Sequence, residues 1–100
     1  MAARRVEFRG WACRVERARY GDTERIALPL YAVEDGSPVA VATLHVPALS
    51  LAADEVVIKD YSENAGMLSL LVAAGVVSTP LREVQSGYVT LYVCRCLLPA

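Results

Sequence analysis

The feature that most constrains this chain is a regular alternation of apolar and polar residues near its amino terminus. The apolar positions are Val6, Phe8, Trp11, Cys13 and Val15, and charged residues occupy most positions between them. A period of two is typical of a strand with one buried face and one exposed face. The pattern predicts a strand from Val6 to Tyr20, with Gly10 at a bulge or bend.

Turn signals divide the next residues into further strands. Gly21-Asp22 predicts a turn. The run Glu34–Ser37 contains Asp-Gly and predicts a hairpin between strands at Ile26–Val33 and Val39–Val46. Pro29 lacks an amide hydrogen, so its strand should lie at a sheet edge or bulge there. The strand Val39–Val46 is apolar on both sides for most of its length, which is typical of a central strand.

The spacing then changes from strand to helix. A β-branched run at Val56–Ile58 indicates one more short strand. The following residues predict a helix from Glu63 to Ala74, with Asp60 or Ser62 as the amino-terminal cap and Gly75 as the carboxy-terminal cap.

A strand at Tyr88–Leu97 completes the predicted order. One helix on one face of an antiparallel sheet is the simplest way to cover such a set of strands. We therefore expect a single α+β domain over residues 1–100, with a sheet of four to five strands and one α-helix.

Composition limits the environment of the chain. Apolar residues make up 55% of it, above the roughly 45–50% of typical domains, which excludes a disordered chain and leaves apolar surface for a partner. No stretch reaches the roughly 20 apolar residues of a membrane span, and the first residues lack the apolar core of a signal peptide. Three cysteines, an odd number, indicate free thiols in a reducing compartment, so we expect a cytoplasmic protein.

Candidate catalytic and metal-binding residues are few. Cys94 and Cys96 share a strand face and would have to join Cys13 and His45 to make a zinc site, yet paired zinc cysteines usually sit on a turn. His45 has no neighbouring nucleophile in the sequence. Glycine-rich phosphate loops, paired-histidine helices and nucleophile elbows are also missing. We expect a protein that binds rather than catalyses, with no metal and no cofactor.

Charge is distributed unevenly along the chain. Residues 1–25 carry a net +3, residues 26–63 a net −5 and residues 64–100 a net +1. Because no uniform basic field results, direct nucleic-acid binding is disfavoured as a general property.

The densest acidic group flanks the Val56–Ile58 strand. Its carboxylates are Asp54, Glu55, Asp60 and Glu63, and Tyr61 lies among them. Three interpretations compete: a solvated rim with a helix cap, a recognition patch for a basic partner, and a divalent-cation site that lacks calcium-loop spacing. These five residues are the candidate partner contacts.

The amino-terminal arginines offer a second candidate surface. Arg14, Arg17, Arg19 and the adjacent Tyr20 would be available to contact phosphates. An exposed strand face with interspersed charges explains them equally simply, and we favour that interpretation.

The predicted helix is apolar on every side after Gly66. A surface helix normally has an apolar stripe and a polar face, and a chain of this size has one sheet to cover one helix face. Leu68, Leu70 and Val72 are therefore the candidate residues of a second interface. A twofold homodimer would cover them, and so would a host target.

One segment resembles a known family. The family consists of small phage and conjugative-element proteins that carry a domain of unknown function. Its blocks correspond to IKDYSEN-x-GM at Ile58–Met67, LV-x-AGVV at Leu71–Val77 and SG-[FY]-V…VC-x-L at Ser86–Leu97, with weaker matches at Asp35–Ala40 and Thr43–Pro47. The resemblance covers about residues 20–97, and the arginine-rich residues 1–19 depart from it.

The resemblance implies a mobile-element origin and supplies no catalytic residue. By analogy with small phage proteins that block host defence, such as anti-CRISPR proteins, it implies an inhibitor in the bacterial cytoplasm that occupies the surface of an effector complex without catalysis. The alternative is a nucleic-acid-binding accessory protein of a mobile element that uses the amino-terminal arginines.

Overall fold

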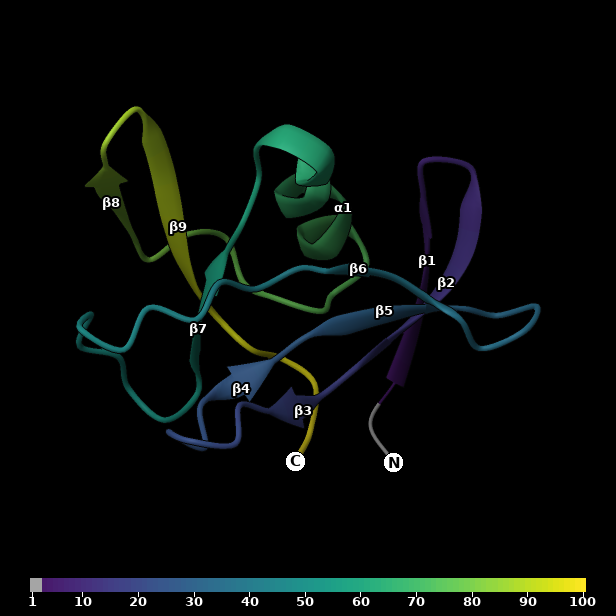
Figure 1. The fold of residues 1–100 in the computed structure, drawn as a ribbon, viewed down its shortest axis with the longest axis horizontal. Coiled ribbons are helices and arrows are strands. Elements are labelled where there is room, and N and C mark those ends of the chain that lie inside the picture. Colours follow the sequence, from purple (N-terminus) through teal and green to yellow (C-terminus); the bar gives the residue numbers. More distant parts are fainter. Residues whose placement is uncertain (1–2) are drawn as a thin grey trace.

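The computed structural model describes residues 3–100 and contains, within them, nine strands in three antiparallel sheets together with one short α-helix (Figure 1). The α+β class with an antiparallel sheet and one helix is thus confirmed. The elements in chain order are β1 Ala3–Phe8, β2 Trp11–Glu16, β3 Ala18–Arg19, β4 Ile26–Ala27, β5 Pro29–Ala32, β6 Pro38–Val41, β7 Glu55–Ile58, a 3-10 turn at Ser62–Asn64, α1 Met67–Ala73, β8 Arg82–Ser86 and β9 Val89–Arg95.

The first sheet has the order β1-β2-β5-β6. The single strand predicted for Val6–Tyr20 is wrong, because the chain reverses at Arg9-Gly10 and Phe8 pairs with Trp11. Arg9 has φ 52° and Gly10 has φ 83°. Two positive φ values are those of a type I′ turn, whose twist matches a two-residue hairpin. Gly10 therefore marks a hairpin rather than a bend within one strand.

The predicted hairpin at Glu34–Ser37 is confirmed, and Asp35 Oδ1 accepts hydrogen bonds from Ser37 N at 3.0 Å and Ser37 Oγ at 2.7 Å. The Pro29 strand, β5, lies between β2 and β6 and so is not at an edge. The predicted alternative, a bulge at Pro29, is found one residue after Pro29, where the pairing register with β6 shifts between Leu30 and Tyr31.

The central position predicted for Val39–Val46 is wrong for its first part. Strand β6 ends the sheet, and its residues are half-buried or exposed. The next residues cross to the other side of the molecule, where Ala42 N donates to Leu28 O and Leu44 N donates to Val57 O, both at 2.9 Å. This crossing segment is buried at Ala42 and Thr43, so the apolar run on both sides reflects the crossing rather than a long strand.

The third sheet has the order β7-β9-β8. Strand β8 was not predicted, and β9 begins at Val89, one residue later than the expected strand. Gly87 and Tyr88 form the two-residue turn between them, with Gly87 at φ 61°. A glycine of positive φ at the first turn position is typical of a type II′ hairpin.

The predicted helix is shorter than expected. Gly66 adopts φ 93° and interrupts the path, so a 3-10 turn precedes α1. The predicted cap is wrong, because Gly66 and neither Asp60 nor Ser62 is the N-cap of α1. Asp60 still contacts the first turn, where its Oδ1 accepts the amide of Leu68 at 2.9 Å. The end at Gly75 is confirmed: Gly75 N donates to Val72 O and Val76 N donates to Leu71 O, which is the Schellman arrangement.

Two apolar clusters hold these elements together. The larger one fills the space between the first sheet and α1, with Met67 and Leu71 fully buried against strand residues such as Val6 and Leu30. The smaller one surrounds Val57, Leu91 and Val93 of the third sheet. Each such side chain contributes roughly 1.5–3 kcal/mol on burial. Within residues 3–100 no helix has the length and apolar character needed to cross a membrane.

Candidate functional site

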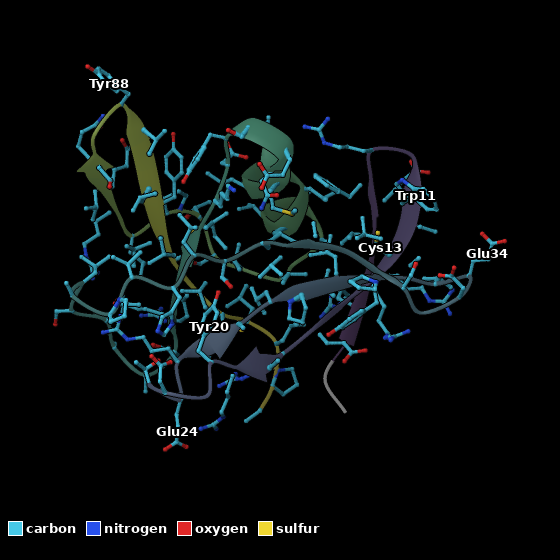
Figure 2. The ribbon with its side chains drawn as sticks, viewed as in Figure 1. Trp11, Cys13, Tyr20, Glu24, Glu34 and Tyr88 are labelled. Carbon is cyan, nitrogen blue, oxygen red and sulfur yellow. The ribbon has the colours of Figure 1, made fainter. Side chains whose placement is uncertain are left out.

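A groove of about 520 Å³ separates the β1–β2 turn from the segment before α1. We call it the Trp11 groove. Its lining consists of Phe8, Arg9, Trp11, Val39, Ala40, Val41, Thr43, Leu44, Lys59, Glu63 and Asn64. Trp11 is 54% exposed and Val41 is 47% exposed, and both are among the few large apolar side chains of the described residues left at the surface. Figure 2 shows Trp11 on the projecting β1–β2 hairpin.

Local sequence explains how the groove is built. The Arg9-Gly10 turn places Arg9 at the end of the hairpin, and its side chain reaches across to the 3-10 turn. Arg9 Nε donates to Glu63 O at 3.0 Å, and Nη2 donates to Ser62 O at 3.4 Å. On the other side, buried Asn64 donates through Nδ2 to Val41 O at 2.7 Å. Two polar links therefore fix the walls of the groove.

The groove carries one positive charge without a carboxylate partner. Among residues 3–100, no carboxylate lies within ion-pair distance of Arg9, whose hydrogen bonds go to backbone carbonyls. Lys59 Nζ, in contrast, donates to Glu63 Oε2 at 2.6 Å. That hydrogen bond raises the pKa of the Lys59 ammonium and lowers the pKa of the Glu63 carboxyl, which the positive charge of Arg9 lowers further, so both groups stay charged.

The predicted acidic contacts lie before, in and after strand β7, which Figure 1 labels. They do not form one free patch. Asp54 and Glu55 lie at the start of β7, where Arg95 Nε approaches Asp54 Oδ2 at 2.9 Å and Arg82 Nη1 approaches Glu55 Oε1 at 3.3 Å. Strand β7 separates them from the residues at its other end.

The remaining predicted acidic contacts also have intramolecular partners. Asp60 binds the helix amide described above, and Glu63 pairs with Lys59. Tyr61 is half-buried against the smaller apolar cluster, with Lys59 Nζ 5.2 Å from the centre of its ring. Of the five predicted residues, only Glu63 lines the Trp11 groove.

The predicted nucleic-acid contacts are likewise dispersed. Arg14 pairs with Glu16 and lies 5.6 Å from the ring of Tyr31. Tyr20 shares a 2.9 Å hydrogen bond between its hydroxyl and Thr43 Oγ1. Arg17 and Arg19 lie together along a different groove, which Arg14 and Tyr20 do not line.

The proposed second interface on α1 is less open than its sequence indicates. Leu68, Leu70 and Val72 are half-buried and pack against the larger apolar cluster. The helix has seven residues, and β1 of the first sheet lies against it.

The titratable groups available for chemistry are mostly shielded. All three cysteines are buried; burial raises the pKa of the Cys94 thiol to about 11 and also raises the pKa of Cys13. The raised pKa keeps the Cys13 and Cys94 thiols protonated at neutral pH, which makes them poor nucleophiles. His45 Nε2 lies 3.2 Å from Asp22 Oδ1, and its ring centre is 4.3 Å from that of Tyr20. No group of three or more His, Cys, Asp or Glu residues within 3–100 is arranged to hold a metal ion.

The sequence did not predict that Trp11 and Val41 lie at the surface, and it did not single out Arg9, which the alternation places on the exposed face, as a residue of this groove. The alternation assigned Trp11 to the buried face. Trp11 does point to the same side of β2 as the buried residues Cys13 and Val15, but it lies at the tip of the hairpin, beyond the core. The available signal was the Arg-Gly pair between two alternating runs, which fits a two-residue hairpin as well as a bulge.

Comparison of the chain with protein-family models, with curated proteins and with solved structures gives no match.

Proposed function

We propose that this chain is a non-catalytic binding protein of a mobile element, and that it inhibits a host defence complex by docking on it through the Trp11 groove. A CRISPR effector complex is one such target. The observation that carries the proposal is the exposure of Trp11 beside Val41 over a preformed groove. Tryptophan is strongly enriched among the residues that dominate binding energy at protein interfaces.

The rigidity of the groove supports this role. Arg9 links the hairpin to the 3-10 turn, and Asn64 links that turn to β6. A surface that is already ordered loses less conformational entropy when a partner binds. The segment Ile58–Met67, which carries the family resemblance, supplies one wall through Lys59, Glu63 and Asn64.

The charges of the groove indicate the chemistry of the partner. Arg9 keeps several donor hydrogens free beside an apolar surface, and an arginine fork prefers a carboxylate partner. The complementary surface is a protein segment with an apolar side chain for Trp11 and Val41 and an adjacent acidic residue for Arg9. This assignment replaces the acidic group around β7 as the main contact, because Asp54 and Glu55 are already paired with arginines.

Co-purification with tagged defence complexes from immune bacteria tests the proposal. We expect the wild-type chain to be retained and to restore phage plating, and Trp11→Ala or Val41→Asp to abolish both effects. Tyr88→Ala is the matched control, since Tyr88 is also an exposed aromatic residue but lies outside the groove. Retention of the Trp11→Ala variant at wild-type level, or no retention of the wild type by any defence complex, would refute the proposal.

We also propose that the chain can form a homodimer through apolar surface that a host target would otherwise cover. A homodimer would cover the half-exposed parts of Leu68, Leu70 and Val72 on α1. Light scattering at micromolar concentration measures it directly. A mass twice the 10.8 kDa of the chain that collapses on Leu70→Asp supports the dimer, and a mass of 10.8 kDa refutes it.

A further inference from the structure

A second groove, of about 430 Å³, lies where β3 and β4 meet the segment before β7. We call it the arginine groove. Its lining consists of Arg17, Arg19, Thr23, Glu24, Arg25, Ile26, Leu51, Ala52, Ala53 and Glu55. Figure 2 shows Glu24 at the lower left and Trp11 at the upper right, and the two linings share no residue, so the two grooves are separate surfaces.

Two of the three arginines in this groove keep their charge uncompensated. Arg17 Nη1 donates to Leu98 O at 2.7 Å, and Arg25 donates to Val46 O at 2.7 Å and to Leu49 O at 2.6 Å. A carbonyl satisfies a donor hydrogen and leaves the positive charge in place. Within residues 3–100 neither guanidinium has a carboxylate within 4.0 Å, whereas Arg14, Arg19, Arg82 and Arg95 each form an ion pair.

The acids that line the groove compensate this charge weakly. Glu24 approaches Arg19 at 3.6 Å, and the two side chains are 80% and 60% exposed, so solvent screens the pair. Glu55 is occupied by Arg82 and by the amide of Ala52 at 3.0 Å. The groove therefore has an excess of positive charge in a chain whose net charge is −1.

We propose that the arginine groove binds a phosphate monoester carried by a small organic molecule. Guanidinium groups bind phosphate oxygens with matched geometry, and a monoester brings a charge of about −1.5 to −2 at neutral pH. The apolar part of the lining, Ile26, Leu51, Ala52 and Ala53, provides a surface for the organic group. The volume is in the range of small-molecule sites, roughly 300–1,000 Å³.

The same geometry opposes a nucleic-acid strand as the ligand. A strand brings another phosphate every few ångströms, and the lining includes the carboxylates of Glu24 and Glu55, which repel phosphates. No aromatic side chain lines the groove, whereas proteins that bind single strands stack bases on aromatic rings.

Calorimetric titration at low ionic strength tests the proposal, with adenosine 5′-monophosphate, inorganic phosphate and a short oligothymidylate as probes. We expect the nucleotide to bind, and its ³¹P NMR signal to shift when the protein is added. Inorganic phosphate should bind more weakly than the nucleotide. Arg19→Gln should weaken nucleotide binding about tenfold, because one charged hydrogen-bond donor is lost. Arg19 is the variant of choice since its one ion pair is exposed and its loss leaves the fold intact.

Two further variants separate binding from misfolding. Glu24→Gln removes the carboxylate that competes for Arg19 and should strengthen binding, an effect that an unfolded protein does not produce. Arg5→Gln makes the same change of charge as Arg19→Gln at an exposed position outside the groove and should bind like the wild type.

Four results would overturn the proposal. They are no nucleotide binding, equal affinity in the Arg19→Gln and Arg5→Gln variants, inorganic phosphate binding as tightly as the nucleotide, and oligothymidylate binding more tightly than the nucleotide. None of these results bears on the Trp11 groove, since its lining shares no residue with the arginine groove.

Discussion

Four of the seven arginines in the first 25 positions have a different kind of partner from the basic residues in and near the last sheet, whereas Arg14 and Arg19 pair with Glu16 and Glu24. Arg4, Arg9, Arg17 and Arg25 donate hydrogen bonds to backbone carbonyls that are distant in sequence. In the third sheet and the segment that follows β7, Arg95 and Lys59 instead pair with the carboxylates of Asp54 and Glu63. Arg82 does both, since it also donates to Ser50 O at 2.9 Å.

A count of charges does not distinguish an arginine that stabilises the fold from an arginine whose charge is neutralised. A carbonyl partner ties an arginine into the fold and leaves its charge available, whereas a carboxylate partner neutralises the charge and ties down little. The acidic group around β7 is the densest in the sequence but is largely neutralised. The arginines near the amino terminus stabilise the fold and supply the positive charge of both grooves.

The largest effect expected from this comparison is at Arg25. Replacement of Arg25 by Met removes both hydrogen bonds that hold the segment Val46–Leu49. Hydrogen bonds to a charged group contribute about 1.5–3 kcal/mol each, so we expect the loss of two to lower the free energy of unfolding by about 3–6 kcal/mol. Urea denaturation followed by circular dichroism measures it.

The matched control for that prediction is Arg5→Met. Arg5 is exposed, has no hydrogen bond or ion pair among the described residues, and lies opposite Arg14 across the hairpin. Its replacement should leave the free energy of unfolding within roughly 0.5 kcal/mol of the wild-type value. Equal losses at Arg25 and Arg5 would remove the distinction between the two uses of arginine.

A smaller effect is expected at Arg17, which has one hydrogen bond to Leu98 O. Arg17→Met should lower the free energy of unfolding by about 1.5–3 kcal/mol and should loosen the carboxy-terminal residues. Digestion by a carboxypeptidase under native conditions measures that loosening, and cleavage should reach Leu98 faster in the variant. Unchanged digestion together with unchanged stability would show that the Leu98 contact is dispensable.

How far the sequence predicts this fold depends on whether a signal is local. The Asp35-Gly36 hairpin, the β7 strand and the Gly75 helix end were predicted because turn residues and β-branched runs act on adjacent backbone. The β1–β2 hairpin and the late start of α1 were missed, because Arg9-Gly10 and Gly66 permit either a continuous element or a break. Tertiary pairing decides between those possibilities.

The candidate sites were less predictable than the fold. Which carboxylate meets which arginine depends on pairs such as Arg82–Glu55 and Arg95–Asp54, which are far apart in the chain and adjacent across strands. The exposure of Trp11 depends on how far its hairpin projects beyond the core. Neither quantity is encoded in the spacing of nearby residues.

A still smaller effect is expected for the exposed ion pair of the third sheet. Arg95 and Asp54 are about half exposed, at 52% and 49%, and such pairs contribute roughly 0.2–1 kcal/mol. Arg95→Met should therefore cost less than Arg17→Met, and the loss should vanish at high salt, where screening weakens the wild-type pair. A loss that exceeds that of Arg25→Met at any salt concentration would reverse the comparison.

The smallest effect is expected at Tyr88, whose side chain projects from the β8–β9 hairpin and is fully exposed (Figure 2). The turn does not depend on this ring. Gly87 supplies the positive φ, Gln85 Nε2 donates to Gly87 O at 3.3 Å, and Thr90 Oγ1 donates to Gln85 Oε1 at 3.0 Å. Tyr88→Ala should change the free energy of unfolding by less than roughly 0.5 kcal/mol, whereas Gly87→Ala should cost more because alanine resists the left-handed conformation. Parallel urea titrations compare the two variants, and a larger loss at Tyr88 than at Gly87 would mean that the ring packs on the protein and that the turn is not the source of the hairpin's order.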